Sequence, residues 1–140
     1  MTGEAQCAVF TQRKTPAPGD IDELGHVNNA VYVRWIQDVA VAHWYAVAPA
    51  DLAANVVWVV VRHEIDYRAP SHLGETLTLR TWVGDAPKGA RYDRFVEVTG
   101  PDGKVRVRAL TTWALLDRES RRPMRVTAEI TAPFVPKKSV

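Results

Sequence analysis

The sequence predicts an α+β fold, in which one long helix is followed by a run of antiparallel strands. Apolar residues recur at spacings of three and four from Asn29 to about Val47, which is typical of an amphipathic helix. Beyond this segment, stretches rich in valine, leucine, threonine and aromatic residues alternate with short turns. Together, the helix and the strands indicate an antiparallel sheet that wraps around the helix on one face.

The helix is expected to begin at Asn28 or Asn29 and to end before Pro49. Asparagine side chains accept hydrogen bonds from the free N–H groups of a first helical turn and are therefore common N-caps. Proline cannot continue a helix and often follows its end. The apolar positions of the segment are Val31, Tyr32, Trp35, Ile36, Val39, Ala42 and Ala46. We expect this face to lie against the sheet.

Turn residues separate the predicted strands. Prolines and a glycine within residues 16–19 end a first, loosely alternating strand at Cys7 to Lys14. The further strands are expected at residues 56–67, 75–84, 91–99 and 104–116. Gly-Pro-Asp-Gly at residues 100–103 connects the last two, because proline presets one turn dihedral and glycine accepts a positive one. From Asp117 onward we expect a surface loop and a partly ordered end.

Length and composition fit one folded domain spanning residues 1–140. Hydrophobic residues make up 46% of the chain and charged residues 24%, as in ordinary folded proteins. The net charge of +2 is too small to favour nucleic acid as a partner. A sheet with one covering helix leaves strand edges exposed, so we expect a homodimer or homotetramer.

Cysteine content and the N-terminal sequence bear on the compartment. Cys7 is the only cysteine, so the chain can form no internal disulfide. The segment from Met1 to Phe10 includes Glu4 and Gln6 and lacks the basic start and apolar core of a signal peptide. No run approaches the roughly eighteen apolar residues that a membrane span requires. These features favour a cytoplasmic protein without a membrane partner.

The segment from Asp20 to Tyr32 concentrates the polar chemistry of the chain. It contains carboxylates, a glycine, an imidazole and two amides, directly before the predicted helix. The N-terminus of a helix offers unpaired N–H groups and the positive end of the macrodipole, and therefore favours a developing negative charge. A carboxylate just upstream can face a carbonyl group whose oxygen rests on those N–H groups. We therefore predict an acyl-transfer site in this segment.

The order of elements and the motif Asp-x-Asp-x-x-Gly-His-Val-Asn-Asn-x-x-Tyr at residues 20–32 resemble the hotdog-fold acyl thioesterases of the 4-hydroxybenzoyl-CoA thioesterase-like group. Weaker similarities are Glu-Ile-Asp-Tyr-Arg-Ala-Pro at 64–70 and Thr-Trp-Ala-Leu-Leu-Asp at 112–117. The resemblance spans nearly the whole chain. It implies a hotdog fold and the hydrolysis, without a cofactor, of a thioester carried by coenzyme A or by acyl carrier protein.

The resemblance also implies roles for individual residues. By its position in the motif, Asp22 matches the catalytic carboxylate, acting as base or as nucleophile. The backbone N–H of Asn29 matches the donor that would hold the oxyanion, and His26 is a third catalytic candidate. The acyl group is expected to lie along the helix or at a subunit interface. The candidate substrate-binding residues are Gly25, Asn28, Tyr32, Trp35 and Trp58.

The plant acyl-carrier-protein thioesterases carry a closely similar Asp and His-Val-Asn-Asn motif, but the match to them is incomplete. They have a polar residue where this chain has Leu24. Their additional Glu-Cys pattern on the next strand has no counterpart near Arg68 and Ala69. The resemblance therefore favours the bacterial type of site, which is centred on the aspartate at position 22.

Each motif residue also has a structural interpretation. Asp20 lies in a loop rich in proline and glycine, where aspartate commonly closes a turn with its own backbone. Asn28 and Asn29 are ordinary helix caps, and Tyr32 is typical of a core. His26 can brace the loop by bonding to backbone carbonyls.

Several other functions stay open at this point. The histidines at positions 43, 63 and 72 lack the spacing of a metal site, and we expect neither a metal nor a cofactor. The alternatives are a hotdog hydratase or dehydratase that uses His26 with Asp22, a non-catalytic acyl-CoA-binding module, and an interaction domain whose acidic loop only caps the helix. Release of free thiol from an acyl-CoA would separate the thioesterase from all three.

Overall fold

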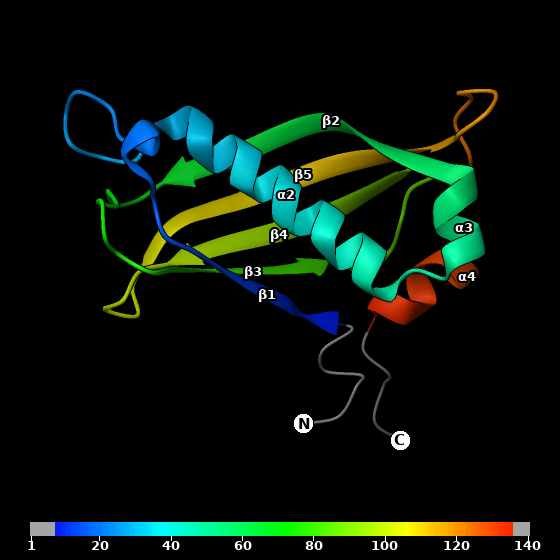
Figure 1. The fold of residues 1–140 in the computed structure, drawn as a ribbon. Helices are drawn as coiled ribbons and strands as arrows, with labels where there is room; N and C mark the ends of the chain where they lie inside the picture. Colours follow the sequence, from blue (N-terminus) through cyan, green and yellow to red (C-terminus); the bar gives the residue numbers. More distant parts are fainter. Residues whose placement is uncertain (1–7, 136–140) are drawn as a thin grey trace, which may run out of the picture.

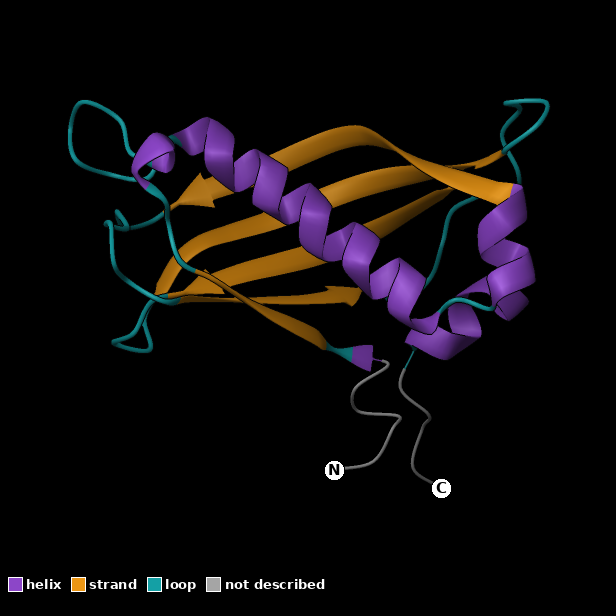
Figure 2. Ribbon diagram, in the orientation of Figure 1, coloured by secondary structure: helices purple, strands orange, loops and turns teal. Residues whose placement is uncertain are grey.

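The computed structural model describes residues 8–135, which form one antiparallel sheet and one long helix (Figures 1 and 2). The strands are β1 (Phe10–Lys14), β2 (Val56–Tyr67), β3 (Leu77–Val83), β4 (Arg91–Thr99) and β5 (Val105–Asp117). The helices are η1 (Pro18–Asp20), α2 (Asn29–Val47), α3 (Ala50–Asn55), α4 (Ala128–Thr131) and η2 (Ala132–Phe134). Cys7, the expected start of the first strand, lies outside the described residues. None of the helices in residues 8–135 combines the length and the apolar character needed to cross a bilayer.

The sheet has the strand order β1-β3-β4-β5-β2, and every neighbouring pair is antiparallel. β1 and β2 are therefore the edge strands. α2 lies across one face of the sheet, and its first turn follows the loop after η1 (Figure 2). This arrangement confirms the predicted α+β hotdog fold, and α2 runs over the range that its apolar spacing predicted.

Alternation along the strands directs one set of side chains toward α2. In β4, every second residue from Tyr92 to Val98 is buried. On the helix, Ile36 is 1% exposed and Val39 is fully buried, and both belong to the core cluster that includes Val96. The same cluster contains Val27, which anchors the loop before α2 in the core and so positions the predicted site.

The C-terminal segment is not the surface loop that the sequence predicted. It forms α4 and η2, in which Ile130 and Phe134 are buried together with Val126. The Phe134 ring stacks on that of Trp44, with 5.5 Å between the ring centroids. The prediction was wrong because these apolar residues are too few to show a helical period, and their burial depends on contacts with Trp44 of α2 and with Val56, Tyr92 and Leu115 of the sheet.

Candidate functional site

The residues expected to be catalytic lie around the loop between η1 and α2. Oδ1 of Asp22 accepts hydrogen bonds from Leu24 N at 3.0 Å and from His26 N at 3.3 Å. Backbone bonds close the same turn, from Asp22 N to His26 O at 2.8 Å and from Gly25 N to Asp22 O at 3.0 Å. Gly25 has a φ of 81°, which glycine adopts at little cost. Asp22 is half-buried, and these hydrogen bonds hold its carboxylate in one orientation.

The first turn of α2 begins beside this loop. Asn28, one of the two predicted candidates, is its N-cap, and its Oδ1 accepts a hydrogen bond from Ala30 N at 2.9 Å. The carbonyl oxygen of Asn28 accepts from Val31 N, also at 2.9 Å. The N–H of Asn29, by contrast, donates to no group within residues 8–135. The helix therefore starts with an exposed and unpaired N–H group next to the Asp22 loop.

Asp20 has a structural role in this loop. Its Oδ2 accepts a hydrogen bond from Ala17 N at 2.9 Å and caps η1. Its carbonyl oxygen accepts from Asn28 N at 2.9 Å, and its Oδ1 lies 3.4 Å from Nη2 of Arg34 on α2. Asp20 thus connects the loop to the helix, as its interpretation as a turn residue predicts.

Residues from the end of β2 and from the loop after it complete the surroundings of the motif. The hydroxyl of Tyr67, the last residue of β2, donates to Asn29 O at 3.4 Å. The His26 ring meets the ring of His72 edge-on, with 5.2 Å between centroids. The motif therefore lies at the end of β2 where the chain leaves the sheet.

Two residues expected to bind substrate lie in the core. Tyr32 is 2% exposed and Trp35 is 5% exposed, and their rings pack edge-on at 5.6 Å. The Tyr32 hydroxyl is buried without a hydrogen-bond partner within residues 8–135. Burial raises the pKa of this phenol, and the neighbouring Ser71 and the charge of Arg106 offset part of the rise. Both rings thus support the first two turns of α2 from inside.

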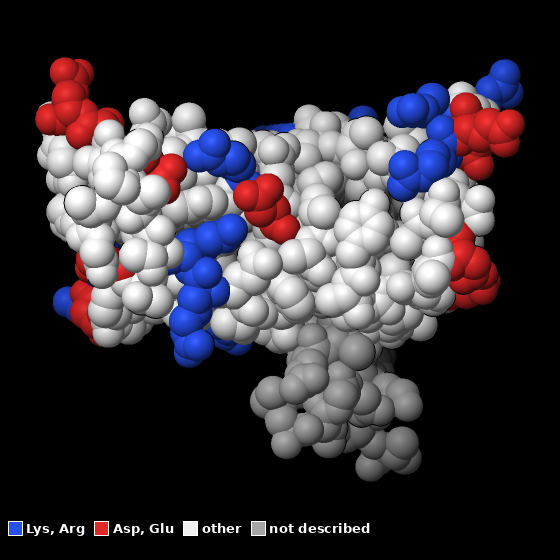
Figure 3. Space-filling model, in the orientation of Figure 1, with Lys and Arg blue, Asp and Glu red and all other residues white. Residues whose placement is uncertain are grey.

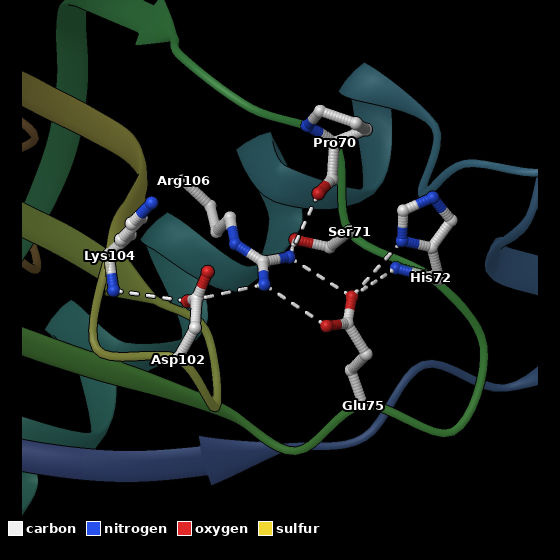
Figure 4. Close-up of polar contacts among 7 residues, drawn as sticks. All are labelled: Pro70, Ser71, His72, Glu75, Asp102, Lys104 and Arg106. Carbon is white, nitrogen blue, oxygen red and sulfur yellow. Dashed lines mark hydrogen bonds and ion pairs between the residues drawn. The ribbon is translucent and has the colours of Figure 1, made fainter.

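A buried arginine that the sequence analysis did not single out braces the loop before β3. Nη1 and Nη2 of Arg106 each donate to one carboxylate oxygen of Glu75 at 3.0 Å, and Nη1 also donates to Pro70 O at 2.8 Å (Figure 4). Ser71, the next residue, is fully buried, and its carbonyl oxygen accepts from Val27 N at 2.9 Å. Arg106, Glu75, Pro70 and Ser71, which we call the Arg106 cluster, therefore support the motif through this backbone contact.

Charge pairing dominates the Arg106 cluster. The hydrogen bonds from Arg106 hold the pKa of Glu75 at about 2, and the Glu75 carboxylate raises the pKa of Arg106. A Cβ atom on Gly100 would overlap the guanidinium, so any side chain here would displace Arg106 from its hydrogen-bond partners. Glu75 and Arg106 are 31 residues apart, and no local pattern in the sequence connects them.

An apolar cavity lies toward the other end of α2. Its volume is about 180 Å³, and α2, the strands β2 to β5 and the α4–η2 segment border it. Its aromatic lining consists of Trp44, Tyr45, Trp58, Tyr92, Trp113 and Phe134. Of the predicted substrate-binding residues, Trp58 lines this cavity. No residue of the motif loop borders it. Within one subunit, the candidate catalytic groups and the cavity are therefore apart.

An open groove of about 600 Å³ runs between α2 and the edge strand β2, and it shares Val41, Trp58 and Trp113 with the cavity. Val41 is 45% exposed and Val59, also in the groove, is 39% exposed. On the face drawn in Figure 3, charged side chains lie at both ends and over the first half of α2. The surface over the C-terminal half of α2 carries few of them, and Val41, Ala42, Val59 and Val60 give the groove an apolar wall beside Asp38.

Comparison with known proteins identifies the family. The family model of the thioesterase-like superfamily matches residues 16–134. Long-chain acyl-CoA thioesterase FadM of Escherichia coli is 27% identical over 115 residues, which cover 79% of this chain and 85% of FadM. The chain belongs to the thioesterase-like superfamily, as its motif and element order predicted.

Two further relatives define the extent of the similarity. Acyl-[acyl-carrier-protein] hydrolase FATB3 of Cuphea viscosissima is 24% identical over 88 residues, covering 63% of this chain but only 21% of FATB3, so the match spans about a fifth of that relative. SAV2348 of Staphylococcus aureus, solved in complex with CoA, has a TM-score of 0.80 at 18% identity and covers 94% of this chain and 87% of its own. At this identity the structural similarity supports the fold.

Proposed function

We propose that the protein hydrolyses the thioester of an acyl-CoA to a free acid and a thiol. The observation that carries this proposal is the proximity, within one loop and helix start, of the fixed Asp22 carboxylate and the unpaired N–H of Asn29. The names of the relatives support it, since FadM is a long-chain acyl-CoA thioesterase and FATB3 is an acyl-[acyl-carrier-protein] hydrolase. We favour coenzyme A as carrier because the FadM match covers most of both chains. A cytoplasmic site of action, based on the single cysteine, is part of the proposal.

In the proposed mechanism, Oδ2 is the reactive oxygen of Asp22, because Oδ1 is occupied by N–H groups of the loop. As a base, Oδ2 takes a proton from water, and the oxygen of that water bonds to the thioester carbonyl carbon. The C–S bond then breaks, and the departing sulfur takes up a proton. Attack by Oδ2 itself, followed by hydrolysis of the anhydride, leads to the same products. In both routes the N–H of Asn29 and the helix dipole stabilise the oxyanion.

We also propose that the protein acts as a homodimer joined along β2. This edge strand is 12 residues long, and one side of it has no strand partner within residues 8–135. Exposed edges of this length favour pairing with another strand. Val59 and Val61 on β2 are 39% and 42% exposed, and the apolar groove runs beside them. A two-fold axis would pair β2 antiparallel with its own copy and extend the sheet across both subunits.

Such a dimer would unite the two separated regions. Tyr67, at one end of β2, contacts Asn29 of the motif, while Val56, at the other end, lines the cavity. Antiparallel pairing places the Tyr67 end of one strand beside the Val56 end of the other. The catalytic loop of one subunit would then lie close to the cavity of its partner, so that an acyl group bound there could reach it.

Asp22→Asn tests the catalytic proposal. Asparagine keeps the size of the side chain and one oxygen for the loop hydrogen bonds, but it removes the charge. We expect release of free thiol, measured on acyl-CoA esters of differing chain length and aromatic character, to fall at least about a hundredfold. Glu23→Gln changes an exposed neighbouring carboxylate and should keep the wild-type rate. Full activity of Asp22→Asn would assign the reaction to another residue, and ester binding without turnover by the wild type would favour a non-catalytic binding module.

Val61→Lys tests the dimer. A charged side chain on the β2 edge should convert the dimer to a monomer in light scattering and should lower thiol release with it. Leu73→Lys is the matched control, because Leu73 is 55% exposed but lies outside β2. A wild type that is monomeric at assay concentration would contradict this assembly.

A further inference from the structure

The apolar cavity contains a buried charge that the proposed mechanism does not use. Arg94 is 8% exposed and lines the cavity. Its Nη1 lies 2.8 Å from Nδ1 of His43 and 3.0 Å from Oγ1 of Thr81, and it donates to both because a guanidinium has no acceptor. Within residues 8–135, no carboxylate forms an ion pair with Arg94.

The acidic residue next to Arg94 in the sequence is not its counter-ion. Asp93 also borders the cavity, but strand alternation places its side chain on the opposite face of the sheet. On that exposed face, Oδ1 of Asp93 accepts a hydrogen bond from Thr112 Oγ1 at 2.8 Å. The Asp93 charge is therefore directed away from the guanidinium.

A second buried donor belongs to the same cavity. Trp113 is 8% exposed and lines the cavity, and its indole Nε1 has no hydrogen-bond partner within residues 8–135. The hydroxyl of Tyr92, another lining residue, already donates to Gly84 O at 2.8 Å. The wall of the cavity thus combines a cation with an unused N–H donor in aromatic surroundings.

These donors define the chemistry of a ligand. Burial lowers the pKa of Arg94 to about 10, because removing a guanidinium from water disfavours its charged form. An anion with acceptor oxygens would restore the lost solvation and would also pair with the Trp113 N–H. A carboxylate fits this requirement, since its planar pair of oxygens matches guanidinium donors.

We propose that this cavity binds the carboxylate of a small apolar organic acid, with Arg94 as its counter-ion and Trp113 as a second donor. An apolar cavity of about 150 Å³ holds benzene. A volume of about 180 Å³ therefore accommodates one ring or a short chain against Trp44 and Phe134. This inference rests on the proposed function. The ligand is either the free acid that hydrolysis releases or an acyl group that carries a carboxylate in addition to its thioester.

Calorimetric titration with benzoate tests the carboxylate site, and benzamide serves as its uncharged analogue of the same shape. We expect saturable binding of benzoate and at least tenfold weaker binding of benzamide. Arg94→Met should weaken benzoate binding at least about tenfold, since a hydrogen bond to a charged group is lost. Arg80→Met removes an exposed arginine from the opposite face of β3 and should leave benzoate affinity unchanged.

A second variant keeps the test independent of the folding of Arg94→Met. Trp113→Phe retains an aromatic ring but removes the N–H donor together with part of the ring surface, and it should weaken benzoate binding several-fold. Equal affinity for benzoate and benzamide would overturn the inference, as would an unchanged benzoate affinity in folded Arg94→Met or the absence of saturable binding.

Hydrolysis assays distinguish the two sources of the carboxylate. If the free acid is the ligand, benzoate inhibits thioester hydrolysis competitively, and Arg94→Met relieves the inhibition. If the acyl group carries the carboxylate, Arg94→Met raises at least tenfold the KM of a dicarboxylic mono-CoA thioester relative to that of a monocarboxylic thioester of equal length. The titration itself needs no turnover. A protein that binds benzoate through Arg94 but hydrolyses nothing contradicts the proposed function alone, and an active protein without such binding contradicts this inference alone.

Discussion

Two arginines are buried to nearly the same degree on neighbouring strands, but their partners differ. Arg106 is 7% exposed and Arg94 is 8% exposed. Arg106 shares two hydrogen bonds with the Glu75 carboxylate, whereas Arg94 contacts a histidine and a threonine. The pKa values move in opposite directions, because Glu75 raises that of Arg106 while burial lowers that of Arg94 to about 10.

This difference indicates that the charge of Arg106 has a structural role, whereas the charge of Arg94 is available to a ligand. At the motif end, Arg106 and Glu75 hold the loop whose backbone contacts Val27, and the chain supplies both members of the pair. At the cavity end, residues 8–135 supply the cation but no carboxylate that pairs with it. Replacing Arg106 should therefore lower the stability of the fold, whereas replacing Arg94 should weaken ligand binding and leave stability nearly unchanged.

Arg106→Met is expected to have the largest effect on stability. It leaves the Glu75 carboxylate without its partner and removes the donor to Pro70 O. We expect the free energy of unfolding to fall by about 3 kcal/mol, the lower end for a broken buried pair because Glu75 is partly exposed. Urea denaturation measures this change. A loss below about 1 kcal/mol would mean that the pair does not hold the loop.

Gly100→Ala should have the next largest effect. The new methyl group would overlap the Arg106 guanidinium, which its hydrogen bonds prevent from moving freely. Overpacking of this kind costs about 1–3 kcal/mol, measurable by the same denaturation experiment. Gly103→Ala is a less suitable control because Gly103 has a φ of 80°, whereas Gly19→Ala meets no neighbouring atom and should be nearly neutral.

The pH dependence of stability sharpens the comparison further. Because the folded pKa of Glu75 is about 2, below its ordinary value of 4.5, its contribution is fully present above about pH 4.5 and is lost as the pH falls toward 2. Glu75→Gln should therefore lower the melting temperature at pH 7, and the difference from wild type should shrink between pH 4.5 and pH 2. A difference that does not depend on pH would show that the glutamate acts without its charge.

Arg94→Met should have the smallest effect on stability. No carboxylate within residues 8–135 pairs with Arg94, and replacing buried ionic groups by apolar side chains of similar volume is often neutral or stabilising. We expect a melting temperature equal to or above that of the wild type without ligand, while benzoate stabilises the wild type alone. A strongly lowered melting temperature would assign Arg94 the same structural role as Arg106.

Much of the fold was predictable because its signals are local. The apolar spacing of α2, its Asn28 cap and the alternation of the strands come from residues close together in the sequence. α3 was not predicted. The C-terminal helices were not predicted either, since Ile130 and Phe134 are buried by contact with α2 and with strands that are distant in the sequence. The candidate site was predictable through its motif, but the separation of Trp58 from the motif loop within one chain was not.

By itself, the sequence determined the long helix and the turn before it. The hydrogen bonds of Asp22 join residues no more than four positions apart, and short-range bonds of this kind need no other element. Only the tertiary structure decided which charges are paired. Arg94 and His43 are 51 residues apart and Arg106 and Glu75 are 31 apart. Strand register and helix packing bring each pair together and also remove it from water, and a linear sequence states neither.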